Sequence, residues 1–289
     1  MEAILPQIMT GLSIASILLL VALGLAIIYG TTGVINLAHG EFVMLGAYTA
    51  WALQTHIGIG LIESLVIIFA VVALLGWIIE RVVIRYLYRR PLDTILATWG
   101  IGVMAQQAIR LIVGGELRYV EMPDMLAGSV SVLGVETSLF RIFVLFLAVA
   151  LFAFTWYLIH RTNIGMKLRA ITQDREMAAC FGINGQRIYG LTFAYGAGLA
   201  GLAGALVSPL KSVSPEMGTT YVVDAFMVVV LGGVESLIGT VASSAIIGEL
   251  TGFLAFFQND TIAKAVVLLA IVILIRFRPQ GLFSTTVRS

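Results

Sequence analysis

Residues 3–40 read AILPQIMTGLSIASILLLVALGLAIIYGTTGVINLAHG and contain no Asp, Glu, Lys or Arg. Residues 42–62 contain none either. Because a bilayer-spanning helix needs about 20 mostly apolar residues, these two stretches predict helices that cross a membrane. Over the whole chain of 289 residues, 60% are hydrophobic and 11% are charged, whereas a soluble domain has roughly 25% charged residues. The predicted fold class is therefore all-α, a polytopic bundle of membrane helices.

The apolar runs predict nine spans, within a range of about eight to ten. They lie near residues 8–30, 40–58, 61–84, 93–113, 139–160, 189–209, 221–238, 240–257 and 262–276. Glycine and proline interrupt several of them, which predicts broken helices. An acidic residue, an apolar run and then glycine occur near Glu41 and again near Asp224. This echo favours an internal repeat of about five spans within a single transmembrane domain, residues 1–289.

The sixth predicted span is unusually rich in glycine. Small residues spaced three or four apart let helices approach each other closely in lipid. The span is therefore expected to lie inside the bundle, packed through Gly190, Gly196, Gly198, Gly201 and Gly204.

Basic residues concentrate on one side of the predicted spans. That side receives 12 of the 17 Lys and Arg residues, namely Arg81, Arg85, Arg89, Arg90, Arg161, Lys167, Arg169, Arg175, Arg187, Arg276, Arg278 and Arg288. Because cytoplasmic loops carry an excess of Lys and Arg, this side is predicted to be cytoplasmic. The other side, which includes residues 116–136, is net acidic. Nine spans then place the N-terminus outside and the C-terminus inside.

A polar segment, residues 161–187, lies on the predicted cytoplasmic side. It contains one short predicted helix, with Thr172 as its N-cap and Asp174 near its positive end. Gly182, followed by Asn184 and Gly185, is expected to end the helix. Because a helix of about two turns is not stable alone in water, we expect this one to be docked on something.

Small and apolar side chains mark this short helix as a surface for another protein. Met177, Ala178 and Phe181 fall on one face at helical spacing, and small residues beside them allow close approach. A plain connector between two spans is the alternative. The residues expected to couple to a partner are Thr172, Asp174, Arg175, Met177, Ala178, Ala179, Phe181 and Gly182. A bulky residue at Ala178 or Gly182 is expected to uncouple the partner while leaving the protein folded.

Polar side chains inside the predicted spans mark a candidate solute pathway. Ionisable residues at membrane depth are costly and usually face a cavity or a partner. The alternative for the first group is an interfacial turn in which Glu41 caps or pairs with His39. The candidate set is Asn36, His39, Glu41, Thr94, Thr98, Trp99, Gln106 and Asp224. The hydroxyl and amide groups of the fourth span suit a small neutral solute, although bonding between helices is their commoner use.

Several kinds of chemistry lack the residues that they need. His39 and Glu41 have no further His or Cys at metal-ligand spacing, so a metal site is not expected. The single cysteine, Cys180, excludes an internal disulfide. The chain has no phosphate-binding loop, no catalytic constellation and no basic domain of the kind that binds nucleic acid. Any ATP must therefore be handled by another chain.

Four motifs resemble one known family. Residues 35–41, Ile-Asn-Leu-Ala-His-Gly-Glu, followed by 44–48, Met-Leu-Gly-Ala-Tyr, resemble the signature of the branched-chain amino acid ABC permease family. Residues 178–183, 231–233 and 278–283 do so as well, and the similarity covers essentially the whole chain. Within the family, the urea-transport branch is the most similar, through residues 92–100, 175–180 and 224–230. Glu235 departs from the family pattern, which has a small residue there.

The resemblance implies the permease subunit of an ATP-driven urea importer that works by alternating access in a bacterial inner membrane. The implied partners are a second, homologous but different permease chain, two cytoplasmic ATPases and a periplasmic solute-binding protein, besides the membrane lipid. ATP and Mg²⁺ are expected on the ATPases, and no cofactor is expected on this chain. The family's ATPase-contacting loop corresponds to residues 172–184.

Three alternatives stay open. A permease for branched-chain amino acids would need charges that balance a zwitterion, whereas urea needs only hydrogen bonds, so the uncharged fourth span favours urea. A passive urea channel would line its pore with the broken helices and ignore ATP. An ion-coupled transporter using Glu41 and Asp224 would lose uptake when the proton gradient collapses.

Overall fold

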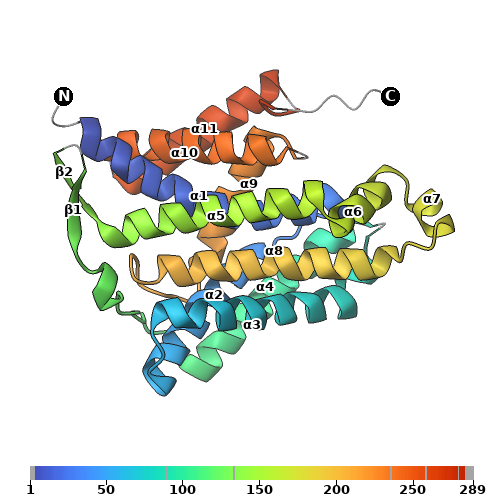
Figure 1. The fold of residues 1–289 in the computed structure, drawn as a ribbon, viewed down its shortest axis with the longest axis horizontal. Coiled ribbons are helices and arrows are strands. Elements are labelled where there is room, and N and C mark those ends of the chain that lie inside the picture. The colour runs from blue at the N-terminus through green and yellow to red at the C-terminus, as the bar shows by residue number, and fades with distance from the viewer. Residues whose placement is uncertain are drawn as a thin grey trace.

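The computed structural model describes residues 4–88, 90–132, 134–234, 236–257, 259–278 and 280–283. Arg89, Glu235 and Arg288, which the sequence analysis names, lie outside these residues. The described part is mostly helical (Figure 1), which confirms the all-α class. Its helices are α1 (Ile4–Thr32), α2 (His39–Ala52), α3 (Leu61–Val82), α4 (Pro91–Val113), α5 (Leu139–Arg161), α6 (Asn163–Gln173), α7 (Arg175–Cys180), α8 (Gly185–Val207), α9 (Met217–Gly232), α10 (Leu237–Phe257) and α11 (Asp260–Phe277).

All nine predicted spans coincide with helices, but the helices differ in their ability to cross a membrane alone. Six are long and apolar enough in the described part, namely α1, α3 with the turn that follows it, α4, α5, α8 and α10. Helix α9 is apolar but has 16 residues, and α2 has 14 before a π-helical turn at Leu53–Ile57. Helix α11 carries Asp260, Lys264 and Arg276. The total of eight to ten spans therefore stays a prediction.

Helices α1 and α8 form the centre of the bundle. In each, about four-fifths of the most apolar segment is buried (78% and 83%), whereas the corresponding share in α3, α4 and α5 is 22%, 11% and 17%. The two central helices cross through glycines, because a methyl group added to Gly196 would stand 2.6 Å from the carbonyl oxygen of Gly24. The predicted packing role of the glycine-rich span is thus confirmed.

Helices α2 and α9 are short because both begin inside the bundle. The Nε2 atom of His39, the first residue of α2, lies 3.0 Å from the carbonyl oxygen of Val21, near the middle of α1. The start of α9 meets the start of α2 through glycine, since a methyl group on Gly218 would stand 2.8 Å from the carbonyl oxygen of Gly40. Two helix N-termini therefore come together within the membrane-spanning layer.

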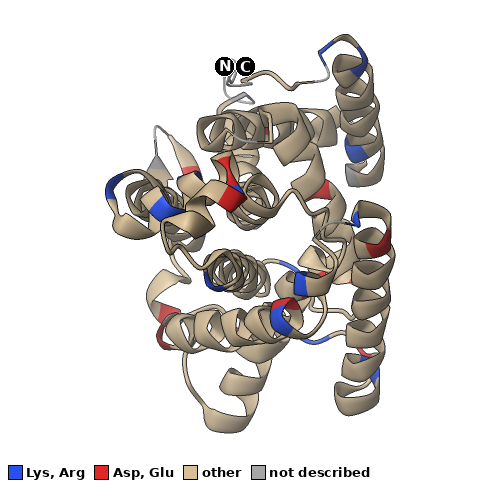
Figure 2. Cartoon of the chain, turned by 90° about the vertical axis from the view of Figure 1, so that its right-hand side faces the viewer, with Lys and Arg blue, Asp and Glu red and all other residues tan. Residues whose placement is uncertain are grey.

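The two ends of the bundle differ in charge and structure. One end carries an antiparallel hairpin, β1 (Ser129–Val132) and β2 (Val135–Ser138), with Ser129 opposite Ser138. The other end carries α6 and α7 (Figure 1). We call it the basic end, because the described Lys and Arg residues of the predicted cytoplasmic side lie on α6, on α7 and at the adjoining ends of α3, α4, α5, α8 and α11 (Figure 2).

Candidate functional site

The segment that leads into α2 buries three polar side chains. Asn36, His39 and Glu41 are 1%, 0% and 5% exposed. Asn36 Oδ1 accepts a bond from the backbone N–H of Ala38 at 3.0 Å, while His39 contacts the carbonyl of Val21. Glu41 bonds to Gln106 rather than to His39. The alternative in which Glu41 pairs with His39 is therefore wrong.

Each of these three side chains also has an atom without a partner. Asn36 Nδ2, His39 Nδ1 and Glu41 Oε2 are buried and make no hydrogen bond within the described residues. A buried polar group that lacks a partner costs about 1–3 kcal/mol. Because His39 Nε2 donates to the carbonyl of Val21, Nδ1 of the neutral ring is an acceptor. The segment at the start of α2 therefore holds one unused donor group, Asn36 Nδ2, and two unused acceptors, which a polar solute or water can satisfy.

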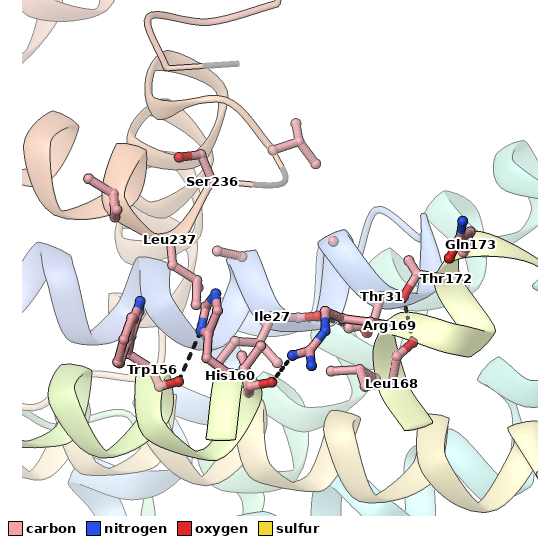
Figure 3. Close-up of a pocket in the computed structure, with 15 residues that line it drawn as sticks. Ile27, Thr31, Trp156, His160, Leu168, Arg169, Thr172, Gln173, Ser236 and Leu237 are labelled. Carbon is pink, nitrogen blue, oxygen red and sulfur yellow. Dashed lines mark hydrogen bonds between the residues drawn. The ribbon is translucent and has the colours of Figure 1, made fainter. Parts of the chain in front are cut away.

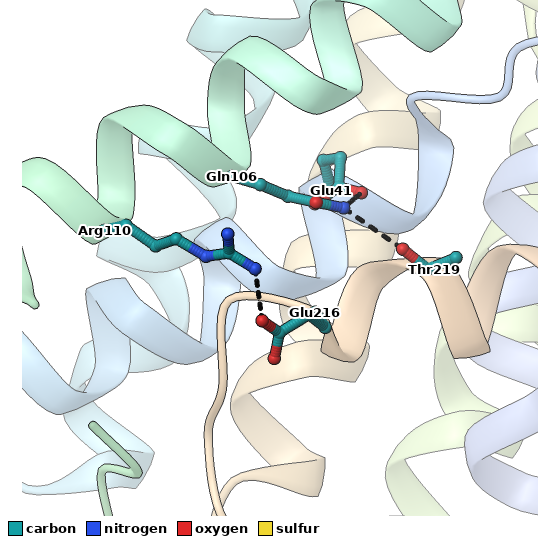
Figure 4. A network of polar contacts seen from close by, with 5 residues as sticks. All are labelled: Glu41, Gln106, Arg110, Glu216 and Thr219. Atoms are coloured by element: carbon teal, nitrogen blue, oxygen red, sulfur yellow. Dashed lines mark hydrogen bonds and ion pairs between the residues drawn. The ribbon is translucent and has the colours of Figure 1, made fainter. Parts of the chain in front are cut away.

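A polar network ties α4 to α2 and α9 (Figure 4). Gln106 Nε2 donates to Glu41 Oε1 at 2.8 Å and to Thr219 Oγ1 at 3.1 Å. One turn along α4, the guanidinium of Arg110 forms an ion pair with Glu216, just before α9. The side chains of Arg110 and Glu216 are 37% and 63% exposed. Because exposed charges are costly against lipid tails, this face of α4 and α9 suits water or a protein partner better than lipid.

The remaining candidates on α4 are not part of this polar network. Thr98 Oγ1 accepts a bond from the backbone N–H of Leu37 at 3.1 Å and donates to the carbonyl of Thr94 at 2.8 Å. Thr94 donates to the carbonyls of Leu87 and Arg90. Both threonines are fully buried. Their hydroxyl groups bond to the backbone and stabilise the segments next to α4, so they are not available to a solute. Trp99 is 60% exposed, and the structure does not bring it to the network.

Asp224 has a separate environment. Its Oδ2 lies 2.6 Å from Lys264 Nζ, which joins α9 to α11. Five residues along a helix turn the side chain by about 140°, so Asp224 and the network residue Thr219 point to different sides of α9. A cavity of about 90 Å³ next to the pair is lined by Lys211 and Tyr221. The carboxylate of Asp224 thus binds a lysine that was not among the candidate residues, and the pathway role of Asp224 stays a prediction.

The polar segment 161–187 holds two helices instead of one. Thr172 lies within α6, where its hydroxyl donates to the carbonyl of Leu168 at 2.6 Å. The N-cap of α7 is Asp174, whose Oδ1 accepts from the N–H groups of Glu176 and Met177, each at 2.9 Å. The prediction of Thr172 as N-cap was therefore wrong, because a carboxylate two residues later caps the short helix.

The end of α7 was predicted in part. Gly182 has φ +77°, a left-handed conformation that favours glycine, and it ends the helix. Asn184 instead begins the next helix, because its Oδ1 accepts from the N–H of Arg187 at the start of α8.

The residues predicted to form one contact face of the short helix differ in burial. Ala178 is buried (4% exposed) in a cluster with Leu168, Ile171, Ile188 and Tyr189. Met177 and Phe181 are 57% and 80% exposed, and Ala179 is exposed as well. Arg175 lies over the ring of Tyr189, 5.4 Å from its centre. The short helix is thus docked on its own chain through Ala178.

This packing corrects the expected effect of substitutions. A bulky residue at Ala178 would disturb the chain's own core, and any side chain at Gly182 is strained by its φ. Met177 on α7 and Phe181, directly after it, are instead the large apolar side chains that point outward.

A cavity of about 800 Å³ lies at the basic end between α1, α5, α6 and the start of α10 (Figure 3). Trp156 and His160 stack along its wall, with ring centres 4.8 Å apart. Arg169 reaches from α6 to the backbone carbonyl of Ile159. Thr172 lines the cavity, but none of the pathway candidates does. The cavity is therefore distinct from the network around Glu41.

Comparison with known proteins identifies the family. The model described as "Branched-chain amino acid transport system / permease component" matches residues 7–276. The chain belongs to this family. With six helices able to cross a membrane, it is a multi-pass membrane protein. No solved structure gives a significant match.

Relatives in the family cover nearly the whole chain. The "High-affinity branched-chain amino acid transport system permease protein BraD" of Pseudomonas aeruginosa is 30% identical over 96% of this chain and 95% of its own length. The corresponding LivH protein of Escherichia coli K12 is 29% identical over 93% of each chain. The "Ribose import permease protein RbsC" of the same organism is 32% identical, but over 49% of this chain and 46% of its own.

Proposed function

We propose that this chain is the permease subunit of an ATP-driven importer that carries urea across a bacterial inner membrane. The observation that supports the proposal most is the network of Glu41, Gln106 and Thr219 at the meeting point of α2 and α9, in a chain of this permease family. The motifs at residues 92–100, 175–180 and 224–230, which resemble the urea-transport branch, favour urea as the cargo.

The network suits a small neutral solute. Urea offers two amide groups and one carbonyl, so it can accept from an amide N–H and donate to a carboxylate. Glu41 supplies the acceptor through its unpartnered Oε2, and Gln106 supplies the donor by exchanging one of its two bonds, to Glu41 or to Thr219, for one to the solute. The unpartnered atoms of Asn36 and His39 extend the set of bonds toward the start of α2. In this proposal the solute passes along the face that α2, α4 and α9 share.

In this proposal, ATP hydrolysis acts on the chain at its basic end. A partner ATPase contacts the outward side chains of α7, Met177 and Phe181. Because α7 packs through Ala178 on α6 and α8, a push on α7 reaches the central helix α8 directly. The long helices then rearrange, and the pathway opens alternately to the two sides of the membrane.

Branched-chain amino acids are the second candidate cargo. The relatives that cover more than nine-tenths of this chain are named for them. The ion pair of Arg110 and Glu216 also favours them, because these two side chains carry the opposite charges that the carboxylate and ammonium of an amino acid would meet. The fourth span was treated as uncharged when urea was favoured, whereas Arg110 on α4 forms this ion pair, so the charge-based reason for urea is weaker.

Transport in proteoliposomes separates the candidates. The vesicles would hold this chain with its neighbouring permease and ATPases, with ATP inside and the binding protein outside. Uptake of labelled urea that depends on ATP, with leucine excluded, is the expected result. Leucine uptake would overturn the cargo but keep the importer. Urea flux without ATP would identify a channel, and uptake that collapses with the proton gradient would identify an ion-coupled transporter.

A further inference from the structure

A second cavity at the basic end, of about 500 Å³, lies between the end of α3 and the start of α8. Its walls include Trp77, Glu80, Arg81, Arg85, Arg187 and Leu191. Asn184, the last residue of the segment expected to contact an ATPase, also borders the cavity. The six wall residues just named belong neither to the pathway candidates nor to the coupling residues.

The cavity has a surplus of positive charge. Three arginines face it, and among the described residues none of the three forms an ion pair. Arg85 donates to the side-chain carbonyl of Gln186 at 2.8 Å, and Arg81 lies over the ring of Trp77 at 5.3 Å. Arg187 is exposed to solvent. Guanidinium groups recognise phosphate oxygens, each through a fork of N–H donors.

The one acid in the cavity wall accepts a hydrogen bond from a tyrosine. Glu80 is 3% exposed, and its Oε1 accepts a bond from the hydroxyl of Tyr88 at 2.7 Å. Tyr88 lies in the loop beyond α3, where burial and the bond to Glu80 raise the pKa of its hydroxyl. The tyrosine therefore remains a donor and bonds the carboxylate. The charge of Glu80 also acts on Arg81 and Arg85, but the three arginines of the wall outnumber this single acid and leave a surplus of positive charge for an anion from outside.

The start of α8 strengthens the attraction for an anion. This helix has 23 residues, and its first turn borders the cavity through Gln186 and Arg187. The N-terminus of a helix carries a partial positive charge and favours negative groups. The helix and the three arginines therefore act on a bound anion in the same sense.

The cavity also lies where a lipid headgroup would be. Trp77 and Leu191 are 37% and 47% exposed, and the apolar face of α3 continues from them through Ile78, which is 41% exposed. A tryptophan next to arginines at the end of a spanning helix is typical of the boundary between hydrocarbon and water. An occupant with a phosphate and an apolar tail matches both parts of the wall.

We propose that this cavity binds an anionic phospholipid, with Arg81, Arg85 and Arg187 on the phosphate and Trp77 beside the glycerol and the first part of an acyl chain. Basic pockets between helices on the cytoplasmic side of a membrane are suited to such headgroups. The bound lipid fixes α3 against the central helix α8 at the end where α7 is also attached.

Native mass spectrometry of the full chain tests the site, with phosphatidylglycerol compared with phosphatidylcholine. The variant R81Q/R187Q should bind phosphatidylglycerol roughly twentyfold or more weakly, about fivefold for each charge removed. The matched control R161Q/R276Q removes two exposed arginines from the ends of α5 and α11 at the same end of the bundle and should bind as the unmodified chain does. Equal losses in both variants, or none in either, would overturn the site.

Additional measurements identify what binds in the cavity. If R81Q/R187Q fails to fold, R187Q is the substitute, because Arg187 is exposed and its replacement should leave the fold intact. R187Q should bind phosphatidylglycerol about fivefold more weakly than the unmodified chain. Inorganic phosphate is the second probe. Binding of inorganic phosphate that R81Q/R187Q abolishes, with no preference between the two lipids, would assign the site to a soluble phosphate. Loss of the ATPases from R81Q/R187Q, with its lipid retained, would assign the surface to a protein partner. Either result would overturn the lipid proposal.

Discussion

At the scale of single residues, Gln106 holds the most consequential position. Its amide is the donor that the described structure gives to the buried carboxylate of Glu41, and it reaches Thr219 on α9 at the same time. A single side chain thus joins three helices. Its neighbour Gln107 lies on the exposed side of α4, which provides a control of the same chemistry one residue away.

We expect Q106L to impair both stability and transport. Glu41 would lose its donor, which costs about 1–3 kcal/mol, and the solute would lose an amide contact. Q107L should change stability by less than about 0.5 kcal/mol, as surface substitutions do. Thermal unfolding in detergent and urea uptake in proteoliposomes would measure the two effects. Equal urea uptake by Q106L and Q107L would show that Gln106 does not contact the solute.

The buried ion pair between α9 and α11 is a second feature of single residues. D224N leaves the ammonium of Lys264 without a carboxylate and should cost about 2 kcal/mol, because Asp224 is buried while Lys264 is one-third exposed. The double variant D224N/K264M removes both charges and should recover at least half of this loss. Thermal unfolding of the three proteins tests the coupling. A double variant at least as unstable as D224N would show that the two side chains are not coupled.

At the scale of elements, α7 separates a packing residue from its outward residues. M177A/F181A should unfold at the temperature of the unmodified chain, yet uptake should fall while the ATPases continue to hydrolyse ATP. A178L should instead destabilise the protein by about 1–3 kcal/mol, because overpacking strains the cluster around Leu168. Unfolding curves and the ratio of uptake to ATP hydrolysis measure these effects. A harmless A178L would contradict the packing described for α7.

Most elements set by local sequence were predicted, but two were missed although the sequence carries their signal. The nine spans coincide with helices because an apolar run is a local signal. Helix α6 was missed, although the spacing of Gly165, Leu168 and Ile171 repeats one buried face. The β1–β2 hairpin was missed too, and the alternation of Val130 and Val132 before Gly134 was its signal.

In the candidate site, the polar residues were predicted but their contacts were not. Glu41 and Gln106 were both singled out, but their contact joins residues 65 apart, and a single sequence holds no sign of it. Lys264, 40 residues from Asp224, was read as part of an apolar span. Thr172 was chosen as a cap because hydroxyls suit that place, and only the structure reveals that the backbone extends at Asp174. The side chains were therefore predictable as polar, whereas their partners were not.

At the scale of the whole molecule, the orientation in the membrane follows from the basic end and is open to a direct test. Cys180, the single cysteine of the chain, is exposed on α7. A membrane-impermeant maleimide should label it in inside-out vesicles and leave it unlabelled in intact spheroplasts. In C180A/E121C the pattern should reverse, because Glu121 lies in the loop at the hairpin end. Labelling of Cys180 from outside would invert the predicted topology.

The meeting of α2 and α9 has a consequence for how the protein is made. With 14 and 16 residues, neither helix is long enough to settle in a bilayer alone. The glycine that α2 packs against, Gly218, leaves the ribosome 178 residues after Gly40 (218 − 40). At a synthesis rate of about 5–20 residues per second, that interval is roughly 10–35 s. For that time α2 has its contacts with α1 and then with α4 but lacks its partner α9, so its assembly depends on the insertion machinery to shelter it until the second half arrives.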